Sequence, residues 1–279
     1  MKTRLFALLA AAALSMGTST SVTLAGSLTD HIKDGKPIRL GFFVSKPGSY
    51  LTDDGKPAGN MNTITLGVLE KMGYTKIEPS AMDWGGQIPA LDADRIDIVT
   101  GGLYITKKRC ESVAFSNPVI VVPNSLVVQK GNPKGLENYQ DILNKGSMLA
   151  VVSGFATIEQ AKHAGITEAH MMAFPGNTQA LAAIKAGRAD AFATSSTEAE
   201  DMAKSSNGEL EATNPDKMPD KNYVAVGFRK SDADFVKAFN DAASSYVGSA
   251  EMMKATAADG YNSKMLPGKV TADEICKNL

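Results

Sequence analysis

The sequence predicts an α/β protein built of two similar lobes, and three features of its pattern support this. Short apolar runs typical of buried strands alternate with stretches that have the apolar spacing of helices, as in βαβ units around a mainly parallel sheet. Each half of the chain contains a strand, a glycine-containing turn and a helix in that order. Two longer extended runs, 119–128 and 223–228, are expected to cross between the lobes.

The first half of the chain begins with an apolar strand over 38–44, which turn residues end. The helix predicted over 62–72 has an apolar face, and Gly73 follows as its C-cap. The other elements expected in this half are a short lead-in helix at 28–33, a hairpin tip at 53–57, strands at 76–79 and 96–100, and a helix from 84 to about 93.

The second half shows the same alternation of strands and helices. Its expected elements are helices at 139–143, 178–186 and 197–204, a helix that opens at Thr157, and strands at 148–152, 171–174 and 190–194. After the second crossover, residues 232–247 have the pattern of an amphipathic helix. Asp97 and Asp190 stand at corresponding strand starts in the two halves, where a structural role is expected.

The length and composition are those of a globular protein with one large domain or two smaller ones. The chain has 279 residues, of which 43% are hydrophobic and 21% are charged, and its net charge is −1. This charge balance gives no reason to expect nucleic acid or an anionic membrane surface as a partner.

The N-terminus predicts a secretory signal peptide over residues 1–25. A basic start is followed by an apolar stretch from Leu5 to Met16 and by small residues near Ala25, where cleavage is expected. The apolar stretch is too short for a spanning helix, and no cysteine stands at the cleavage site to carry a lipid. We therefore expect a mature protein that is free in the periplasm or outside the cell.

Residues 101–110 have the composition of a site for a small carboxylate. They follow a buried strand, and Gly101 and Gly102 at its end would let a ligand lie against bare backbone. Tyr104 adds a ring face, and Arg109 adds a planar cation of the kind that holds a carboxylate through two parallel hydrogen bonds.

This stretch carries a family resemblance. The run Gly-Leu-Tyr-Ile-Thr-Lys-Lys-Arg at 102–109, followed by Phe-Ser-Asn-Pro at 115–118, resembles the signature of the bacterial solute-binding proteins of family 3. Cys110 and Cys276 are similar to cysteines of the ectoine- and hydroxyectoine-binding branch. An acidic residue precedes the arginine in the general family pattern, whereas Lys108 stands there in this chain.

The resemblance implies a type II periplasmic binding protein. In that fold, lobe 1 would comprise residues 26–122 and 223–279, and lobe 2 would comprise residues 123–222. Two crossover strands would join the lobes and act as the hinge that closes them over a ligand. The implied role is that of a monomeric periplasmic receptor that delivers a small carboxylate or zwitterion to the membrane permease of an ABC importer.

The two cysteines of an exported chain suggest one disulfide, Cys110 to Cys276, with two separate thiols as the alternative. The disulfide would fix the C-terminal tail beside Arg109.

The expected ligand-binding residues come from both lobes. Arg109 and Thr157 would grip one carboxylate from opposite sides, because Thr157 opens a helix whose free N–H groups attract anions. The further candidates are the backbone at Gly102, Leu103 and Ala156, the rings of Trp84, Tyr104, Tyr50 and Phe155, and the hydroxyls of Ser45 and Ser195.

Each of these residues also has a purely structural interpretation. Arg109 could be a surface arginine beside a turn, and the rings could be core residues. Thr157 could serve only as a helix N-cap, in a capping box with Gln160.

The sequence departs from the resembled proteins where they place acidic residues. Ser45 and Gly48 stand where the ectoine-binding branch has an acidic residue and a phenylalanine, and Ser195 stands where amino-acid receptors often have an aspartate. The ligand could therefore be a less basic carboxylate, a quaternary or cyclic amine held by rings, or an amino acid held in another way.

Two other functions remain open from the sequence. One is an exported dehydratase for cyclic carboxylates, which would need a general acid or base, and only Glu159 and Glu198 lie near the expected ligand-facing segments. The other is a binding protein that signals to a membrane receptor. The three histidines, His31, His163 and His170, lack metal-ligand spacing, and neither a metal nor a cofactor is expected.

Overall fold

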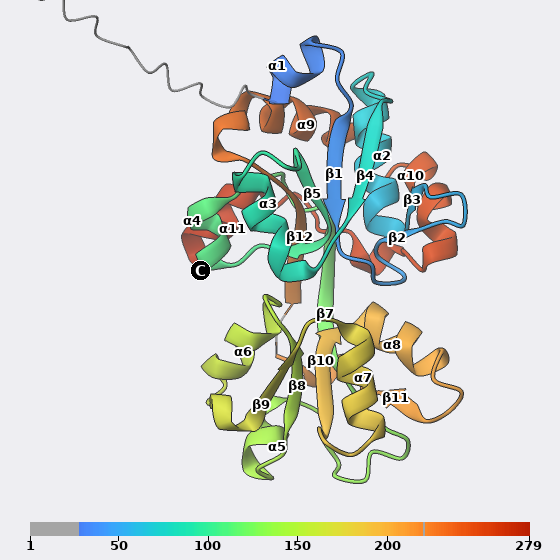
Figure 1. The fold of residues 1–279 in the computed structure, drawn as a ribbon, viewed down its shortest axis with the longest axis vertical. Coiled ribbons are helices and arrows are strands. Elements are labelled where there is room, and N and C mark those ends of the chain that lie inside the picture. The colour runs from blue at the N-terminus through green and yellow to red at the C-terminus, as the bar shows by residue number, and fades with distance from the viewer. Residues whose placement is uncertain (1–27, 220) are drawn as a thin grey trace, which may run out of the picture.

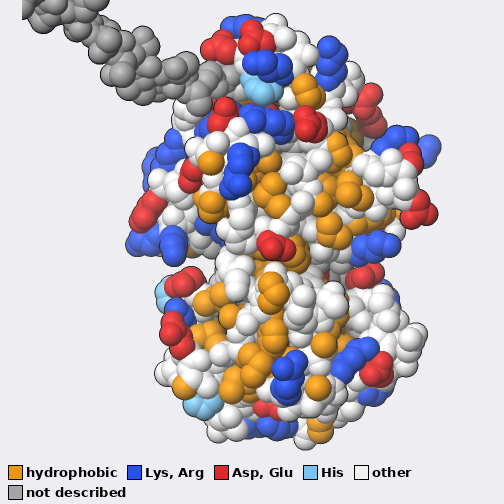
Figure 2. All heavy atoms as spheres, in the orientation of Figure 1, with side chains coloured by type: hydrophobic (Ala, Val, Ile, Leu, Met, Phe, Trp, Pro, Cys, Tyr) orange, Lys and Arg blue, Asp and Glu red, His pale blue; other side chains and the backbone are white. Residues whose placement is uncertain are grey.

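The computed structural model describes residues 28–219 and 221–279 and has the expected two-lobed α/β architecture. The predicted signal peptide at 1–25 lies outside the described residues. Figure 1 shows the lobes one above the other, with β7 (Ile120–Gln129) running between them. The surface narrows to a waist at this junction (Figure 2). In the described part of the chain, no helix has the length and apolarity needed to cross a bilayer.

The helices and strands follow the predicted order. The helices are α1 (Leu28–Lys33), α2 (Asn60–Lys71), α3 (Gln87–Asp92), α4 (Lys107–Ser112), α5 (Tyr139–Asn144), α6 (Thr157–His163), α7 (Asn177–Lys185), α8 (Ser196–Lys204), α9 (Ala233–Tyr246), α10 (Ala250–Thr256) and α11 (Ala272–Asn278). Besides β7, the strands are β1 (Ile38–Phe42), β2 (Tyr50–Leu51), β3 (Pro57–Ala58), β4 (Ile77–Ala81), β5 (Ile98–Tyr104), β6 (Ala114–Phe115), β8 (Leu149–Val152), β9 (Met171–Phe174), β10 (Ala191–Ser195), β11 (Leu210–Ala212) and β12 (Lys221–Phe228). Short 3-10 turns include η1 (Trp84–Gly86).

The sheet runs through both lobes in the order β4-β1-β5-β12-β7-β10-β8-β9. In lobe 1, β1 is parallel to both β4 and β5, and β12 lies antiparallel to β5. In lobe 2, β8 is parallel to both β9 and β10, and β10 lies antiparallel to β7. The parallel strands of each lobe follow from the βαβ connections that the alternating pattern predicts.

The strand β7 changes partners along its length. Its first residues pair with β12, as far as Pro123 opposite Lys221, and the next residue, Asn124, pairs with Ser195 of β10. A single strand therefore belongs to the sheets of both lobes. Together with β12 it connects the two lobes.

In each lobe, an aspartate just before a strand makes the same pair of hydrogen bonds to the neighbouring segment of the sheet. In lobe 1, Asp97 Oδ2 accepts a hydrogen bond from the backbone N–H of Arg39, and the N–H of Asp97 donates to the carbonyl of Arg39. In lobe 2, Asp190 Oδ2 accepts from the N–H of Met148, and the N–H of Asp190 donates to the carbonyl of Met148. The aspartates thus extend the pairing of two neighbouring strands by one step, which is the structural role expected of them.

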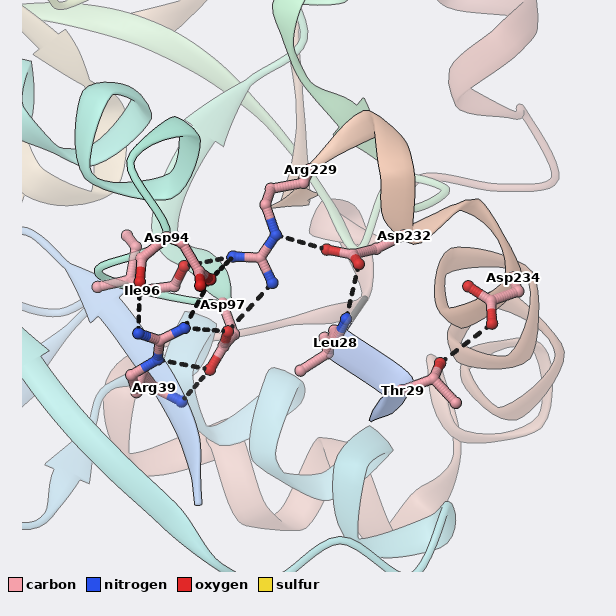
Figure 3. A network of polar contacts seen from close by, with 9 residues as sticks. All are labelled: Leu28, Thr29, Arg39, Asp94, Ile96, Asp97, Arg229, Asp232 and Asp234. Carbon is pink, nitrogen blue, oxygen red and sulfur yellow. Dashed lines mark hydrogen bonds and ion pairs between the residues drawn. The ribbon is translucent and has the colours of Figure 1, made fainter. Parts of the chain in front are cut away.

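A buried ionic network surrounds Asp97 (Figure 3). Asp97 Oδ1 lies 2.7 Å from Nη2 of Arg39 and 3.1 Å from Nη2 of Arg229. Arg229 also contacts Asp232, whose other oxygen accepts from the N–H of Leu28. Burial acts to raise the pKa of Asp97, but the hydrogen bonds from the two arginines hold that pKa below its ordinary value. The network ties β1, β12 and the start of α9 to one carboxylate.

The hydrophobic core has one cluster in each lobe and a third that spans both. Fully buried side chains such as Leu40, Ile64 and Phe239 pack α2 and α9 against the lobe 1 sheet. In lobe 2, Tyr139 and Leu149 belong to a separate cluster. The third cluster holds residues of both lobes, and its shared packing is what brings the lobes together.

The predicted disulfide is confirmed, and neither cysteine is a free thiol. Cys110 in α4 is bonded to Cys276 in α11, with a Cα–Cα distance of 5.9 Å. Both residues pack against the cluster that spans the lobes. The bond therefore fixes the C-terminal helix beside Arg109.

One predicted strand end is wrong. The two glycines were expected to terminate their strand, but β5 continues through Gly101 and Gly102 to Tyr104. Both glycines have positive φ values, 87° and 107°, and the pairing with β12 shifts register between Ala225 and Gly227. They therefore form an irregularity inside the sheet, which bends the backbone without ending the ladder.

Candidate functional site

A pocket lies between the lobes, against the crossover strands. It encloses about 600 Å³ of space not occupied by atoms, a figure that includes space open to solvent. The residues that line it come from both lobes and from the crossover strands: Gly48, Asn60, Met61, Trp84, Gly101, Gly102, Tyr104, Ile120, Val122, Phe155, Thr157, Thr194, Ser195, Thr197, Glu198, Val224 and Met265. Six of the predicted ligand-binding residues are in this lining: Trp84, Gly102, Tyr104, Phe155, Thr157 and Ser195.

The glycine irregularity gives the pocket its bare backbone wall. A Cβ atom on Gly101 would lie 2.7 Å from Oγ of Ser49, so this position has no room for a side chain. At Gly102 the nearest side-chain atom would be 4.0 Å away, on Trp84, but the positive φ still disfavours other residues. The close approach of Ser49 and the backbone conformation thus explain both glycines.

Three rings meet across the gap between the lobes. Phe43 and Trp84 come from lobe 1 and Phe155 comes from lobe 2. The Trp84 and Phe155 centroids are 5.1 Å apart in an edge-to-face arrangement, and Phe43 lies about equally far from both, at 6.0 and 5.9 Å. The indole N–H of Trp84 donates to the carbonyl of Gly154 at 3.0 Å. Trp84 therefore contacts lobe 2 with its ring and its N–H while it also lines the pocket.

Arg109 is buried between the lobes, at 8% exposure, and is not in the lining of this pocket. Its guanidinium donates to the carbonyl of Tyr104 at 2.8 Å and to the carbonyl of Gly154 at 2.9 Å, and it lies 5.5 Å from the Trp84 ring centroid. It lines a second cavity, which Trp84 and Phe155 share with the first.

The charge of Arg109 has no anionic partner among residues 28–219 and 221–279, since both of its acceptors are neutral carbonyls. Burial lowers the pKa of Arg109 to about 10, and the guanidinium is still charged at neutral pH. A buried cation without a counter-charge is costly, so an arriving anion would be stabilised here.

Thr157 is a buried residue of lobe 2 whose hydroxyl has no hydrogen-bond partner among the described residues. The predicted capping box is wrong: Thr157 is the first residue of α6, Ala156 precedes it as the N-cap, and no side chain caps the helix. The Thr157 hydroxyl therefore points elsewhere. It is 2% exposed, lines the pocket, and has no hydrogen-bond partner within residues 28–219 and 221–279. Such a group is expected to be satisfied by something in the pocket.

Glu198 is a pocket residue that the sequence analysis did not assign. It lies in the first turn of α8, and its carboxylate accepts hydrogen bonds from Ser45 of lobe 1 and from Thr194 and Ser195 of lobe 2. Ser45 in turn accepts from Asn177 at 3.0 Å. The two serines at the positions where an acidic residue was expected thus both bind this one carboxylate. The sequence signal for this contact was the spacing of three residues between Ser195, the N-cap of α8, and Glu198 in its first turn.

Three carboxamides join α6 to both crossover strands. Asn124 of β7, Gln160 of α6 and Asn222 of β12 form a closed ring of hydrogen bonds with distances of 2.6 to 3.0 Å. The hydroxyl of Tyr104, which lines the pocket, donates to Oδ1 of Asn124 at 3.2 Å. Burial raises the pKa of Tyr104 well above its ordinary value of 10, so the hydroxyl keeps its proton. The pocket wall is thereby linked to the hinge.

The remaining predicted residues lie outside the pocket lining. Leu103 and Ala156 border the second cavity together with Arg109. Ser45 reaches the pocket only through Glu198. Tyr50 is directed elsewhere, since its hydroxyl donates to Asp259 at 3.0 Å and its ring lies 4.9 Å from the ammonium of Lys46. Among the described residues, no group of three His, Cys, Asp or Glu side chains could hold a metal ion.

The sequence matches the model of one protein family. The model of the bacterial extracellular solute-binding proteins, family 3, matches residues 38–257. The chain is 30% identical to a probable amino-acid ABC transporter periplasmic-binding protein of Sinorhizobium fredii, with 96% of this chain and 92% of that protein covered. It is 28% identical to the lysine/arginine/ornithine-binding periplasmic protein of Escherichia coli, with 83% and 88% covered.

Solved structures show the same fold. EhuB in complex with hydroxyectoine superimposes with a TM-score of 0.81 at 24% identity, over 88% of this chain and 96% of that one. An ancestral arginine-binding protein bound to arginine gives a TM-score of 0.70 at 25% identity, over 81% and 98%. These relatives are binding proteins, and this chain is likewise classed as a binding protein and not as a dehydratase. It belongs to the bacterial extracellular solute-binding proteins, family 3.

Proposed function

We propose that this protein is the periplasmic receptor of an ABC importer and that it binds a small solute bearing a carboxylate. The candidate solutes are amino acids and ectoine-like or betaine-like compatible solutes. The observation that carries the proposal is the buried guanidinium of Arg109, which lies between the lobes without an anionic partner among the described residues.

The carboxylate would be held from both lobes. Arg109 supplies a charged donor from lobe 1, and Thr157 supplies a buried hydroxyl from lobe 2 that has no partner in the part of the chain that the structure describes. Gly154 lies three residues before Thr157, and its carbonyl accepts from Arg109 in this structure. A ligand carboxylate would replace this neutral acceptor with a charged one, and charge-assisted hydrogen bonds are roughly twice as strong.

Binding would be coupled to closure of the lobes by a turn about β7 and β12. The hydrogen bonds that cross the gap include those of Arg109 and Trp84 with the Gly154 carbonyl and that of Ser45 with Glu198. A ligand stabilises the closed form only through contacts that the open form lacks, and a carboxylate shared by Arg109 and Thr157 meets that condition.

Export and delivery complete the proposal. The signal peptide at residues 1–25 would direct the chain to the periplasm and be removed there, without lipidation. The mature monomer would then present its closed form to a membrane permease. The probable amino-acid ABC transporter component of Sinorhizobium fredii, which aligns over nearly the whole chain, supports this partner.

A thermal-shift screen tests the proposal, because a ligand that binds the folded form raises the melting temperature. The screen would compare amino acids, betaines, ectoines and simple organic acids with their carboxamide derivatives. We expect at least one carboxylate to raise the melting temperature while its amide does not, and mass spectrometry to recover the ligand unchanged. Chemical conversion of the ligand, or equal shifts with carboxylate and amide, would reject the proposal.

A further inference from the structure

The pocket lining contains one carboxylate, that of Glu198. Its surroundings indicate which chemical group the other end of the ligand carries. We infer that Glu198 provides the counter-charge for a cationic group on the ligand, and that this group is an alkylated ammonium or a delocalised cyclic cation with few N–H donors. The inference rests on the proposed function, since it assumes that a carboxylate at the other end of the ligand is held by Arg109 and Thr157.

Glu198 is held in place by neutral groups only. Its Oε1 accepts from the hydroxyl of Ser45, and its Oε2 accepts from Thr194 at 2.5 Å and from Ser195 at 2.9 Å. Within residues 28–219 and 221–279, no Lys, Arg or His forms an ion pair with it. These hydroxyls fix the position of the carboxylate and leave its negative charge uncompensated in a half-buried site.

The number of free acceptors limits the kind of cation. A carboxylate has about four lone-pair positions, and three on Glu198 are already occupied. A primary ammonium group needs three acceptors. Glu198 therefore offers about one free acceptor position to a group with three N–H donors. A cation with few N–H donors does not need the missing positions.

The walls of the pocket suit a bulky cation instead. Trp84, Phe155 and Tyr104 offer aromatic rings, and Met61 and Met265 offer thioether side chains. Ring faces attract cations by their negative quadrupole, and methylated cations can contact them without leaving an N–H unsatisfied. The lining thus combines one fixed negative charge with apolar surface.

A purely structural role for Glu198 makes a different prediction. If its bond to Ser45 only fastened the lobes together, removing the Ser45 hydroxyl would weaken all ligands alike and the charge of Glu198 would not matter. The variant Ser45→Ala removes this contact between the lobes and keeps the charge. The variant Glu198→Gln removes the charge and keeps an acceptor for Ser45.

Two pairs of probes separate these roles by calorimetry. Glycine betaine is compared with tert-butylacetate, in which carbon replaces the charged nitrogen, and ectoine is compared with methylcyclohexenecarboxylate, its uncharged carbocycle. In the wild type we expect the cation of at least one pair to bind about tenfold or more tighter than its uncharged partner. Glu198→Gln should remove most of this preference, whereas Ser45→Ala and the exposed control Glu200→Gln should retain it.

Several results would overturn the inference. These are a preference that survives Glu198→Gln, equal binding of the two members of both pairs, and no binding of any probe at about 10 mM, a concentration at which even weak sites fill. Tight binding of primary amino acids alone would also overturn it. The proposed function is tested separately, because carboxylate-dependent binding in the screen would stand even if no charge preference were found.

Discussion

Removal of the disulfide between Cys110 and Cys276 should lower the free energy of unfolding by about 5 kcal/mol. The bond closes a loop between residues 166 apart in sequence, which is most of the described chain. On the chain-entropy model, a crosslink over about 170 residues reduces the entropy of the unfolded chain by an amount worth about 5 kcal/mol at 25 °C. The change is the double substitution Cys110→Ser with Cys276→Ser, which leaves no unpaired thiol.

The assay is guanidinium unfolding of the wild type and the double variant, each with and without reductant and followed by circular dichroism. Reductant should destabilise the wild type to the level of the double variant and leave the double variant unchanged. A loss of less than about 1 kcal/mol in both comparisons would show that closing the loop contributes little, against the entropic reasoning.

Three further predictions concern the pocket and the ionic network. Thr157→Val should leave the free energy of unfolding of the ligand-free protein unchanged or raise it by up to about 1 kcal/mol, because the hydroxyl has no hydrogen-bond partner among the described residues. The same variant should weaken ligand binding about threefold to tenfold by calorimetry, and unchanged affinity would remove Thr157 from the site. Asp97→Asn should cost about 3–5 kcal/mol of stability at pH 7, because the buried Arg229 and the partly buried Arg39 lose the charged carboxylate that they share. Since the pKa of Asp97 is lowered in the folded protein, the difference from the wild type should be full above the ordinary value of 3.8 and shrink as the pH falls below it; a difference independent of pH between 7 and 3 would contradict this. The fluorescence of Trp84 should change on saturation with the ligand, and a flat titration would place the ligand away from this ring.

Strand positions could be predicted because they depend on local apolar runs. The strand expected at 171–174 is found at those residues, and β8 lies within the range expected for it. The course of β5 through its glycines could not be predicted. It depends on the pairing with β12, a strand from far along the chain, and the register of this pairing shifts beside the glycines. A glycine pair alone does not say whether a strand ends or bends.

The candidate site also combines features that local patterns indicate with contacts between distant segments of the chain. Gly102, Tyr104 and Thr157 could be placed near the pocket from local patterns. The spacing of three residues from Ser195 is a local signal for Glu198, but its contact with Ser45, which lies 153 residues away in sequence and in the other lobe, could not be predicted from a local pattern.

The position of Arg109 could not be predicted from the sequence either. It was expected in the same cavity as the other residues, but it lines a second cavity, which shares Trp84 and Phe155 with the first. The packing between the lobes decides which of the two neighbouring cavities the guanidinium lines.

The most direct test of the account is calorimetry with the carboxylate found in the screen, on the wild type, Arg109→Gln and the exposed control Arg188→Gln. Loss of the buried charge in Arg109→Gln should cost 2 kcal/mol or more, which is about 30-fold in affinity, and Arg188→Gln should bind like the wild type. The amide of the ligand should bind both the wild type and Arg109→Gln equally poorly, because the guanidinium and the carboxylate act as a pair. Arg109→Gln binding the carboxylate as tightly as the wild type does would contradict the central claim.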